Sequence, residues 1–395
     1  MEFNPVRGLV AALALVMLSC APAAESVRVD ASVPVDASIG DASEDRDSGA
    51  PDELSVVLEN ARARAGVPAL AALEIEDGEV VQEAAVGRRR ADAEAEVTLD
   101  DRWHLGSCTK AMTAALVALI AGDGALGFDT TLAEAFPGEE IHEQLRSVTL
   151  HQLLIHRAGL PEDRAPTPDI IELLSIAGPV REARAEVARR LLALAPAVAP
   201  GTETRYSNFG YVLVGAALER ATGERWEDLL TARLFAPLGM TSCGFGAPDA
   251  SHAASPTGHV ASSEGGSLRP VPGFDNAPLL GPAGTVHCTL RDWARFVDWS
   301  MQPPADGPVA LSPEAQARLR TPSEDGFASG WLVTTQPWAT GPVFVHQGSN
   351  TAFLAVVWSV PEERRALFAV TNAATAGAGQ ALDAAILGML DAQAR

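Results

Sequence analysis

The 395-residue sequence predicts an α+β fold. Both chain ends are expected to build one antiparallel sheet flanked by helices, with a mainly helical lobe inserted between them. Strand-like segments occur near both ends, at residues 69–75, 80–86, 343–345, 353–360 and 366–371. Long segments with helical spacing fill the middle of the chain. A cleft where the sheet meets such a lobe is a usual location for a functional site.

The N-terminus has the pattern of an export signal. Arg7 precedes an apolar run over residues 8–18, which has the length of a signal-peptide core and is too short to span a bilayer stably. The residues before Cys20, Met17-Leu18-Ser19, resemble a bacterial lipobox in which methionine replaces the usual leucine. We therefore expect residues 1–20 to be a lipoprotein-type signal peptide with Cys20 lipidated, on an exported protein that faces the periplasm. Plain secretion and a retained anchor are the alternatives.

A change of composition follows the signal. Residues 21–52 consist largely of small and acidic residues with a near-repeat over residues 29–38. Such a segment cannot bury enough apolar surface to order itself. We expect it to be a disordered acidic tether that holds a domain at residues 53–395 away from the membrane.

The folded domain begins near Glu53, and local patterns predict its elements. Helical spacing over residues 54–65 stops at Gly66-Val67-Pro68. A turn at Asp77-Gly78 joins the first two strands into a hairpin. Further helices are expected at residues 111–121, 150–156, 169–175, 180–194, 211–221, 226–234 and 381–393.

Charge excludes two classes of partner. The chain has 51 acidic residues against 29 basic ones, a formal net charge of −22. An excess of this size repels nucleic acid and anionic lipid headgroups. We therefore expect neither as a partner, and the lipid anchor expected at Cys20 would be the link to the membrane.

Three cysteines remain once Cys20 is set apart: Cys108, Cys243 and Cys288. In an oxidising compartment at least one of them stays unpaired, and the spacing does not say which. A metal site is a weak alternative, because no two of the three are close in sequence. For Cys108, a packed small residue or a partner for Cys288 is favoured over a nucleophile.

The first chemical element is Ser107 with Lys110, the one lysine beside 28 arginines. A serine hydroxyl is a poor nucleophile until a neighbouring base removes its proton. Residues three apart share a helix face, so Lys110 can reach Ser107 Oγ. An amine can serve as that base only while it is neutral, which burial favours, whereas a guanidinium stays protonated.

The second element is Tyr206-Ser207-Asn208, between a turn and a helix. A phenol close to an amine can act as a general base and then protonate a leaving group. Asn208 offers both a donor and an acceptor to a substrate amide. The alternative is that Tyr206 only packs at the start of the helix.

The third element is His346-Gln347-Gly348-Ser349 on a late strand. A strand edge can lie against a substrate, and glycine permits close approach. Its backbone amides can supply an oxyanion donor beside that of Ser107. A lone histidine at such a position is more often a hydrogen-bonded structural residue than a catalytic one.

In this order and spacing the three elements resemble the serine β-lactamase and penicillin-binding superfamily. The branch with the same signatures (Ser-x-x-Lys, Tyr-x-Asn, and Lys or His followed by x-Gly) contains class C β-lactamases, D-Ala-D-Ala carboxypeptidases and esterases. The resemblance covers about residues 54–392. It includes segments similar to family elements at residues 153–161, 235–240, 281–284, 291–296, 330–331 and 371–372.

The resemblance implies a β-lactamase/transpeptidase-like fold and a site without metal or organic cofactor. Carried over by position, it implies a nucleophile at Ser107, a base at Lys110 and a proton shuttle at Tyr206. The substrate-binding and oxyanion residues that it implies are Asn208, His346, Gly348 and Ser349. The implied reaction is acylation of Ser107, followed by hydrolysis.

Three departures from the family pattern bear on the substrate. His346 replaces the lysine of efficient β-lactamases, Ala352 stands where glycine is common, and Glu162-Asp163-Arg164 occupies the place of a substrate-binding glutamine. Near neutral pH, a histidine supplies less reliable positive charge to a substrate carboxylate than lysine does. These departures weaken the β-lactamase interpretation. Ester hydrolysis demands the least of a site, so we rank it first, with hydrolysis of D-amino-acid peptides second and β-lactam hydrolysis third, each on a small-molecule substrate.

Three rival hypotheses differ in kind. An α/β-hydrolase needs a Gly-x-Ser-x-Gly motif, which the sequence lacks. A zinc hydrolase needs paired histidines at helical spacing, which the eight histidines do not provide. A catalytically weak lipoprotein of the same fold that binds penicillin or peptidoglycan is the third, and the intact Ser107, Lys110 and Tyr206 argue against it.

Overall fold

The computed structural model describes residues 52–124, 126–163, 167–262 and 267–393. The predicted signal peptide, Cys20, residues 21–51 of the predicted tether and Arg164 lie outside these ranges. Within them, no helix combines the length and the apolar character needed to cross a membrane.

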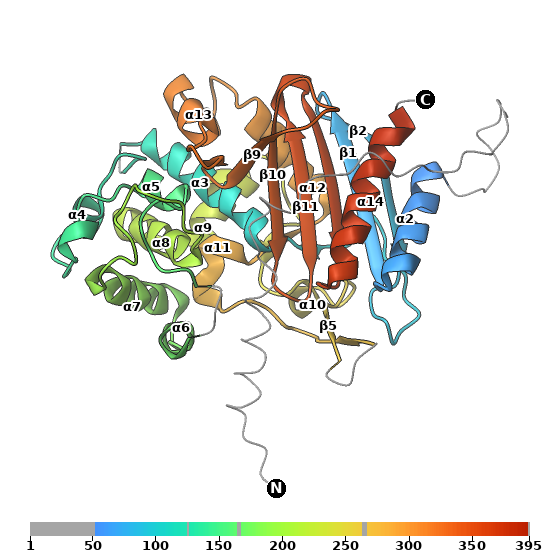
Figure 1. The fold of residues 1–395 in the computed structure, drawn as a ribbon, viewed down its shortest axis with the longest axis horizontal. Coiled ribbons are helices and arrows are strands. Elements are labelled where there is room, and N and C mark those ends of the chain that lie inside the picture. The colour runs from blue at the N-terminus through green and yellow to red at the C-terminus, as the bar shows by residue number, and fades with distance from the viewer. Residues whose placement is uncertain (1–51, 125, 164–166, 263–266, 394–395) are drawn as a thin grey trace, which may run out of the picture.

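A seven-stranded antiparallel sheet joins the two ends of the domain (Figure 1), which confirms the predicted α+β class. Its N-terminal strand β1 (Ala69–Glu76) pairs with the last strand β12 (Arg365–Thr371), from Leu70 opposite Thr371 to Glu76 opposite Arg365. The sheet order is β2-β1-β12-β11-β10-β9-β8. The other strands are β2 (Glu79–Gly87), β8 (Phe327–Ala328), β9 (Trp331–Thr335), β10 (Pro342–Ser349) and β11 (Leu354–Val360).

The sheet separates two hydrophobic cores, which explains why β1 is apolar on both faces. Leu70 and Ala72 belong to the core under α2 (Glu53–Ala65) and α14 (Ala376–Gln393), which lie side by side in Figure 1. Ala71 and Leu73 belong to the core on the opposite face, which extends into the helical lobe. Alternating side chains of one strand point to opposite faces, so each set fills one core.

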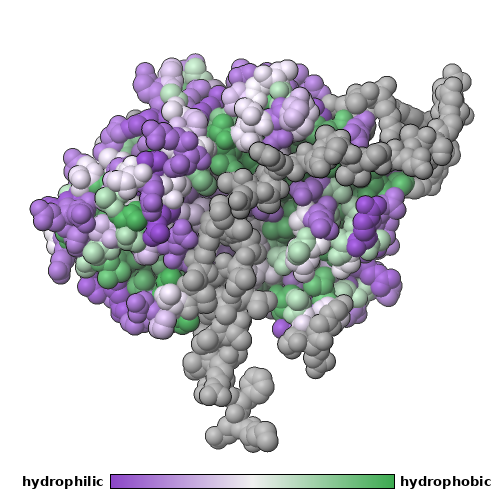
Figure 2. Space-filling view, in the orientation of Figure 1, coloured by the Kyte–Doolittle hydropathy of each residue, from purple (hydrophilic) through white to green (hydrophobic). Residues whose placement is uncertain are grey.

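The helical lobe lies beside the sheet, and α3 (Thr109–Ala121) runs between the two (Figure 1). Figure 2 shows hydrophilic side chains over much of the lobe's visible surface, with smaller hydrophobic areas between them. The longer helices of the lobe are α7 (Val180–Ala193) and α8 (Asn208–Thr222). The shorter ones are α4 (Leu132–Ala135), α5 (Leu150–Leu154), α6 (Pro168–Leu174) and α9 (Trp226–Leu230), the last continuing as a π-turn at Thr231–Phe235.

The remaining elements connect the lobe to the sheet. One small sheet has the order β3-β7-β4 and a second pairs β5 with β6. Three helices belong to this region in addition to α12 (Leu290–Met301), which packs on the sheet. The bounds are β3 (Trp103–His104), β4 (Gly244–Phe245), β5 (His259–Ala261), β6 (Leu268–Pro270), β7 (Val286–Cys288), α10 (Pro248–Ser251), α11 (Gly281–Gly284) and α13 (Pro313–Arg320).

The predicted elements differ from the structure mainly at their ends. The helix expected at residues 150–156 stops at Leu154, and His156 takes a positive φ of 59° that α-helix cannot accommodate. The strand expected at residues 343–345 continues to Ser349 as β10. The final helix begins at Ala376, five residues before the predicted start at Ala381.

The cysteines correct one prediction. Cys243 forms a disulfide with Cys288, and Cys108 is a buried cysteine outside this disulfide. The suggested Cys108–Cys288 pair is therefore wrong, whereas the packed small residue is confirmed. Cys243 lies just before β4 and Cys288 ends β7, and these neighbouring strands bring together cysteines that are 45 residues apart.

We expect removal of this disulfide to lower stability substantially. A cross-link that closes a 45-residue loop restricts the unfolded chain, which is worth about 3–4 kcal/mol in the chain-entropy model. Urea denaturation should show a correspondingly lower free energy of unfolding for the Cys243→Ala/Cys288→Ala variant. The wild type in dithiothreitol should match it. An unchanged midpoint in both samples would contradict the expectation.

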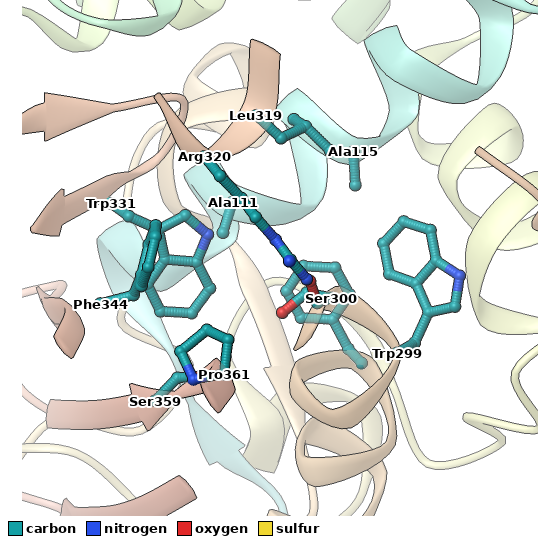
Figure 3. Close-up of a pocket in the computed structure, with 11 residues that line it drawn as sticks. Ala111, Ala115, Trp299, Ser300, Leu319, Arg320, Trp331, Phe344, Ser359 and Pro361 are labelled. Atoms are coloured by element: carbon teal, nitrogen blue, oxygen red, sulfur yellow. The ribbon is translucent and has the colours of Figure 1, made fainter. Parts of the chain in front are cut away.

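A small cavity lies beside α3, and Ser107 is not among the residues that line it (Figure 3). Ala111 and Ala115 of α3 form one wall, and Trp331 and Phe344 lie opposite Trp299. Its volume of about 30 Å³ is far below the roughly 300–1,000 Å³ of typical ligand pockets. The cavity is therefore too small for an ester or peptide substrate.

Candidate active site

Ser107 lies in a 3₁₀ turn, Gly106–Cys108, that leads directly into α3. Lys110 follows in the first turn of α3 with a fully buried side chain, and Ser107 is 5% exposed. The Lys110 ammonium donates a hydrogen bond of 3.0 Å to Ser107 Oγ. The one lysine of the sequence thus contacts the serine that the sequence analysis paired with it.

Lys110 has two further acceptors. Its Nζ donates to Asn208 Oδ1 and to the backbone oxygen of Ala283, both at 2.7 Å. Ala283 belongs to α11, which is fastened to α3 because Thr113 Oγ1 donates to Pro282 O at 2.7 Å. An ammonium has three N–H groups, and here each has an acceptor.

Tyr206 contacts the same oxygen of Ser107 that Lys110 contacts. Its hydroxyl donates to Ser107 Oγ at 2.9 Å, and Lys110 Nζ lies 5.0 Å from the centre of its ring. The imidazole of His156 packs against the tyrosine, with ring centres 4.3 Å apart. His156 Nδ1 accepts from the backbone N–H of Ser207 at 3.3 Å, so it also fixes the segment that carries Tyr206.

The backbone of β10 packs closely against the turn that carries Ser107, at two glycines, Gly348 and Gly106. A Cβ on Gly348 would lie 2.7 Å from Ser107 N, and one on Gly106 would lie 2.2 Å from Ser349 N. Neither distance is sterically possible, and Gly106 also has a positive φ of 51°. Glycine at both positions therefore lets β10 bring the backbone of Ser349 next to that of Ser107.

His346 lies on β10 and is only partly exposed. Its Nδ1 is 3.0 Å from the backbone oxygen of Gly330. Burial, and then the charge of Lys110, hold the pKa of this imidazole well below its usual range. The ring is therefore neutral at physiological pH and offers no positive charge to a substrate carboxylate.

Asp163 lies against Asn208, although in the sequence it stands out only as part of a departure from the family pattern. Its buried carboxylate accepts from Asn208 Nδ2 at 3.2 Å and from the backbone N–H of Phe209 at 3.0 Å. Burial raises its pKa, although these donors and Lys110 act in the opposite direction. The contact turns Asn208 Nδ2 towards Asp163 and leaves Asn208 Oδ1 for Lys110.

The structure thus brings Ser107, Lys110, Tyr206 and Asn208 into direct contact, with β10 alongside. Within the described ranges, no group of three His, Cys, Asp or Glu side chains could hold a metal ion. The neighbouring Cys108 Sγ contacts the backbone oxygen of His346 at 3.6 Å.

A family model described as Beta-lactamase matches residues 55–388, most of the chain. The chain belongs to the β-lactamase family. It is accordingly a serine hydrolase, and its curated relatives include a penicillin-binding protein and a hydrolase. "Penicillin-binding protein 4" of Amycolatopsis lactamdurans is 28% identical over 71% of this chain and 74% of its own length. "Unguisins hydrolase ungD'" of Aspergillus campestris is 24% identical over 67% of this chain, but the match spans only 51% of its own length.

Solved structures share the fold of this β-lactamase family member. D-amino acid amidase from Ochrobactrum anthropi has a TM-score of 0.69 at 20% identity, covering 86% of this chain and 98% of the amidase. A β-lactamase/D-alanine carboxypeptidase from Pseudomonas syringae has a TM-score of 0.68 at 18% identity, covering 86% and 99%. The predicted β-lactamase-like architecture is confirmed.

We expect Asp163→Asn to lower kcat about 10- to 100-fold in this serine hydrolase. The two donors contact different carboxylate oxygens, Asn208 Nδ2 on Oδ1 and Phe209 N on Oδ2, so the NH2 group of the new amide must face one of them. If Asn208 turns over in response, its Nδ2 faces the Lys110 amine, and donor meets donor.

Asp169→Asn is the matched control for this substitution, because Asp169 is exposed in the first turn of α6 and undergoes the same chemical change. Steady-state ester hydrolysis should separate the two variants. Equal activity in both would show that the orientation of Asn208 does not depend on the Asp163 carboxylate.

Proposed function

We propose that this protein hydrolyses small esters through a covalent acyl-enzyme at Ser107, with D-amino-acid amides and peptides as second-ranked substrates and β-lactams as third. The observation that carries the proposal is the contact of Ser107 Oγ with both Lys110 Nζ and Tyr206 OH, at 3.0 and 2.9 Å. A serine between two groups that can exchange protons has the arrangement needed for nucleophilic catalysis.

Acylation begins when Lys110 is a neutral amine. Such an amine has two hydrogens, which can go to Asn208 Oδ1 and Ala283 O, and one lone pair, which can accept the Ser107 proton. Ser107 Oγ then bonds to the substrate carbonyl carbon while its proton passes to Lys110. The negative charge on the former carbonyl oxygen is stabilised by the backbone N–H groups of Ser107 and Ser349.

Tyr206 completes the step. Its hydroxyl gives a proton to the departing oxygen or nitrogen as that bond to carbon breaks, and the phenolate recovers a proton from Lys110. In the hydrolysis step, a water molecule gives a proton to the Lys110–Tyr206 pair and attacks the acyl carbon. The bond from Ser107 Oγ to the acyl carbon then breaks, the acid is released, and Ser107 recovers its proton from the pair. One N–H of Asn208 is engaged by Asp163, and the second remains for a substrate carbonyl.

The charges around the site support substrates that carry no free carboxylate next to the scissile bond. His346 is neutral. Arg157, which follows His156, is paired with Asp325, and Arg205, which precedes Tyr206, is paired with Glu203, each at 2.9 Å. A peptide with a terminal carboxylate would find no ready cation in these groups. Esters and carboxamides do not need one.

D-amino-acid amides are the second candidate class because relatives of the same fold carry that activity in their names, among them the D-amino acid amidase and a D-stereospecific amidohydrolase from Streptomyces. They also lack the terminal carboxylate. Amide bonds are the more demanding, because their nitrogen must be protonated to leave.

A substrate panel tests the proposal. We expect kcat/KM to fall in the order p-nitrophenyl butyrate, D-phenylalanine amide, nitrocefin, with Ser107→Ala inactive on all three. Nitrocefin turnover orders of magnitude above the ester would overturn the ranking. Binding of a fluorescent penicillin without turnover of any substrate would favour the weakly catalytic binding protein instead.

We expect His346 to contribute no inflection to the pH–rate profile of ester hydrolysis between pH 5 and 8. Its folded-state pKa lies below this window, so it takes up a proton only at more acidic pH. Profiles of kcat/KM for the wild type and His346→Gln should therefore show the same inflections. An inflection near pH 6.5 that disappears in His346→Gln would contradict the neutral imidazole.

A further inference from the structure

A second polar cluster lies directly behind Ser107, outside the groups used above. His104 at the end of β3 is fully buried, and its Nδ1 accepts a 3.0 Å hydrogen bond from the backbone N–H of Gly106. Gly106 is the residue that contacts the backbone of Ser349 so closely that a Cβ would not fit. His104 therefore fixes the backbone at Gly106, next to the two predicted oxyanion donors, the N–H groups of Ser107 and Ser349.

The other face of His104 meets a carboxylate. His104 Nε2 lies 2.7 Å from Asp275 Oδ1. Because Nδ1 accepts from Gly106, the proton of a neutral ring is on Nε2, the nitrogen that lies next to Asp275. The carboxylate thus selects the tautomer that leaves Nδ1 free to accept the Gly106 N–H.

Asp275 also reaches the turn that follows Ser349. Asn350 Nδ2 lies 3.5 Å from Asp275 Oδ1, while Asn350 Oδ1 accepts from the backbone N–H groups of Ala352 and Phe353 at 3.1 and 2.9 Å. Ser349 Oγ in turn donates to Phe353 O at 2.7 Å. Asp275 therefore contacts both His104, which fixes Gly106, and Asn350, which fixes the turn after Ser349.

We propose that His104 and Asp275 are positioning residues that set the distance between the backbone N–H groups of Ser107 and Ser349. The proposal rests on the proposed acyl-enzyme at Ser107. The two donors come from segments more than 200 residues apart, the 3₁₀ turn before α3 and strand β10. Oxyanion stabilisation depends steeply on donor placement, so a shared anchor would keep the two in register.

The variants His104→Ala and Asp275→Ala test this arrangement. We expect each to lower kcat for p-nitrophenyl butyrate about 10- to 100-fold with KM changed less than about 3-fold, because the donors act on the transition state. Affinity for phenylboronic acid, whose tetrahedral adduct on Ser107 places an oxygen between the same N–H groups, should fall in the same proportion. The double variant should be no worse than either single one, because the two residues act through one contact.

Two further variants separate positioning from simple packing. His287 lies opposite His104 on β7, is equally buried and contacts Gly246 O instead. We expect His287→Gln to keep kcat within about 3-fold. His104→Gln, whose amide can accept from Gly106 and donate to Asp275, should recover most of the activity lost in His104→Ala.

The outcomes distinguish this proposal from the proposed function. Folded His104→Ala and Asp275→Ala variants with unchanged kcat and boronate affinity would overturn the positioning role while leaving Ser107 catalysis intact. An equal loss in His287→Gln would also overturn it, because buried packing would then account for the effect. Activity that survives in Ser107→Ala would instead defeat the proposed function itself.

Discussion

Lys110→Arg is expected to reduce acylation about 10⁴-fold while the protein remains folded. A guanidinium keeps the positive charge but does not give up its proton, so it cannot accept the proton of Ser107. It can still donate to Asn208 Oδ1 and Ala283 O, the acceptors that Lys110 uses. The measurement is the burst of p-nitrophenol from a single turnover, with a thermal melt to confirm the fold.

The charge itself is the alternative explanation for the importance of Lys110. Arginine retains the charge and methionine removes it, so Lys110→Met is the paired variant. We expect both to be equally inactive, because neither side chain has a basic lone pair that can accept the proton of Ser107. Near-normal turnover in Lys110→Arg would show that Lys110 acts as a fixed cation, and the proposed mechanism would be wrong.

Tyr206→Phe is expected to lower kcat about 10³-fold with a small effect on KM. The substitution removes the hydroxyl that contacts Ser107 Oγ and keeps the ring that packs against His156. The leaving group then departs without a proton donor, and general acid catalysis is worth about 10²–10⁴-fold. The loss should be larger for D-phenylalanine amide than for p-nitrophenyl butyrate, because p-nitrophenolate leaves without protonation.

The chain provides its own control for this prediction, since Tyr211 is its other tyrosine. Tyr211 is fully buried, its ring centre is 5.4 Å from Lys110 Nζ, and its hydroxyl donates to Leu154 O at 2.7 Å instead of to Ser107. Tyr211→Phe should lose stability and keep kcat within a few-fold. Equal losses of kcat in both variants would attribute the effect to packing around Lys110.

Much of the fold and the centre of the site could be predicted from the sequence. The strands at both ends were recognisable because β1, β11 and β12 are apolar and short, bounded by turns. Ser107 and Lys110 were recognisable because a spacing of three puts two side chains on one helix face. Tyr206 and Asn208 were found through their motif and not through any local physical signal.

The remaining features depend on contacts that no local pattern encodes. The backbone oxygen of Ala283 is an acceptor for Lys110 only because α11 packs on α3. Asp163 and Asp275 are ordinary carboxylates in the sequence, and only the fold buries the first beside Asn208 and brings the second to His104. The Cys243–Cys288 pair likewise follows from the adjacency of β4 and β7.

The central claim is that Ser107 becomes acylated, and intact-protein mass spectrometry with a fluorophosphonate tests it most directly. Wild-type protein should gain the mass of one phosphonyl group, and peptide mapping should place it on Ser107. Ser107→Ala should gain nothing, while Cys108→Ala should label like the wild type. Labelling that persists in Ser107→Ala, or that maps to Cys108, would contradict the account.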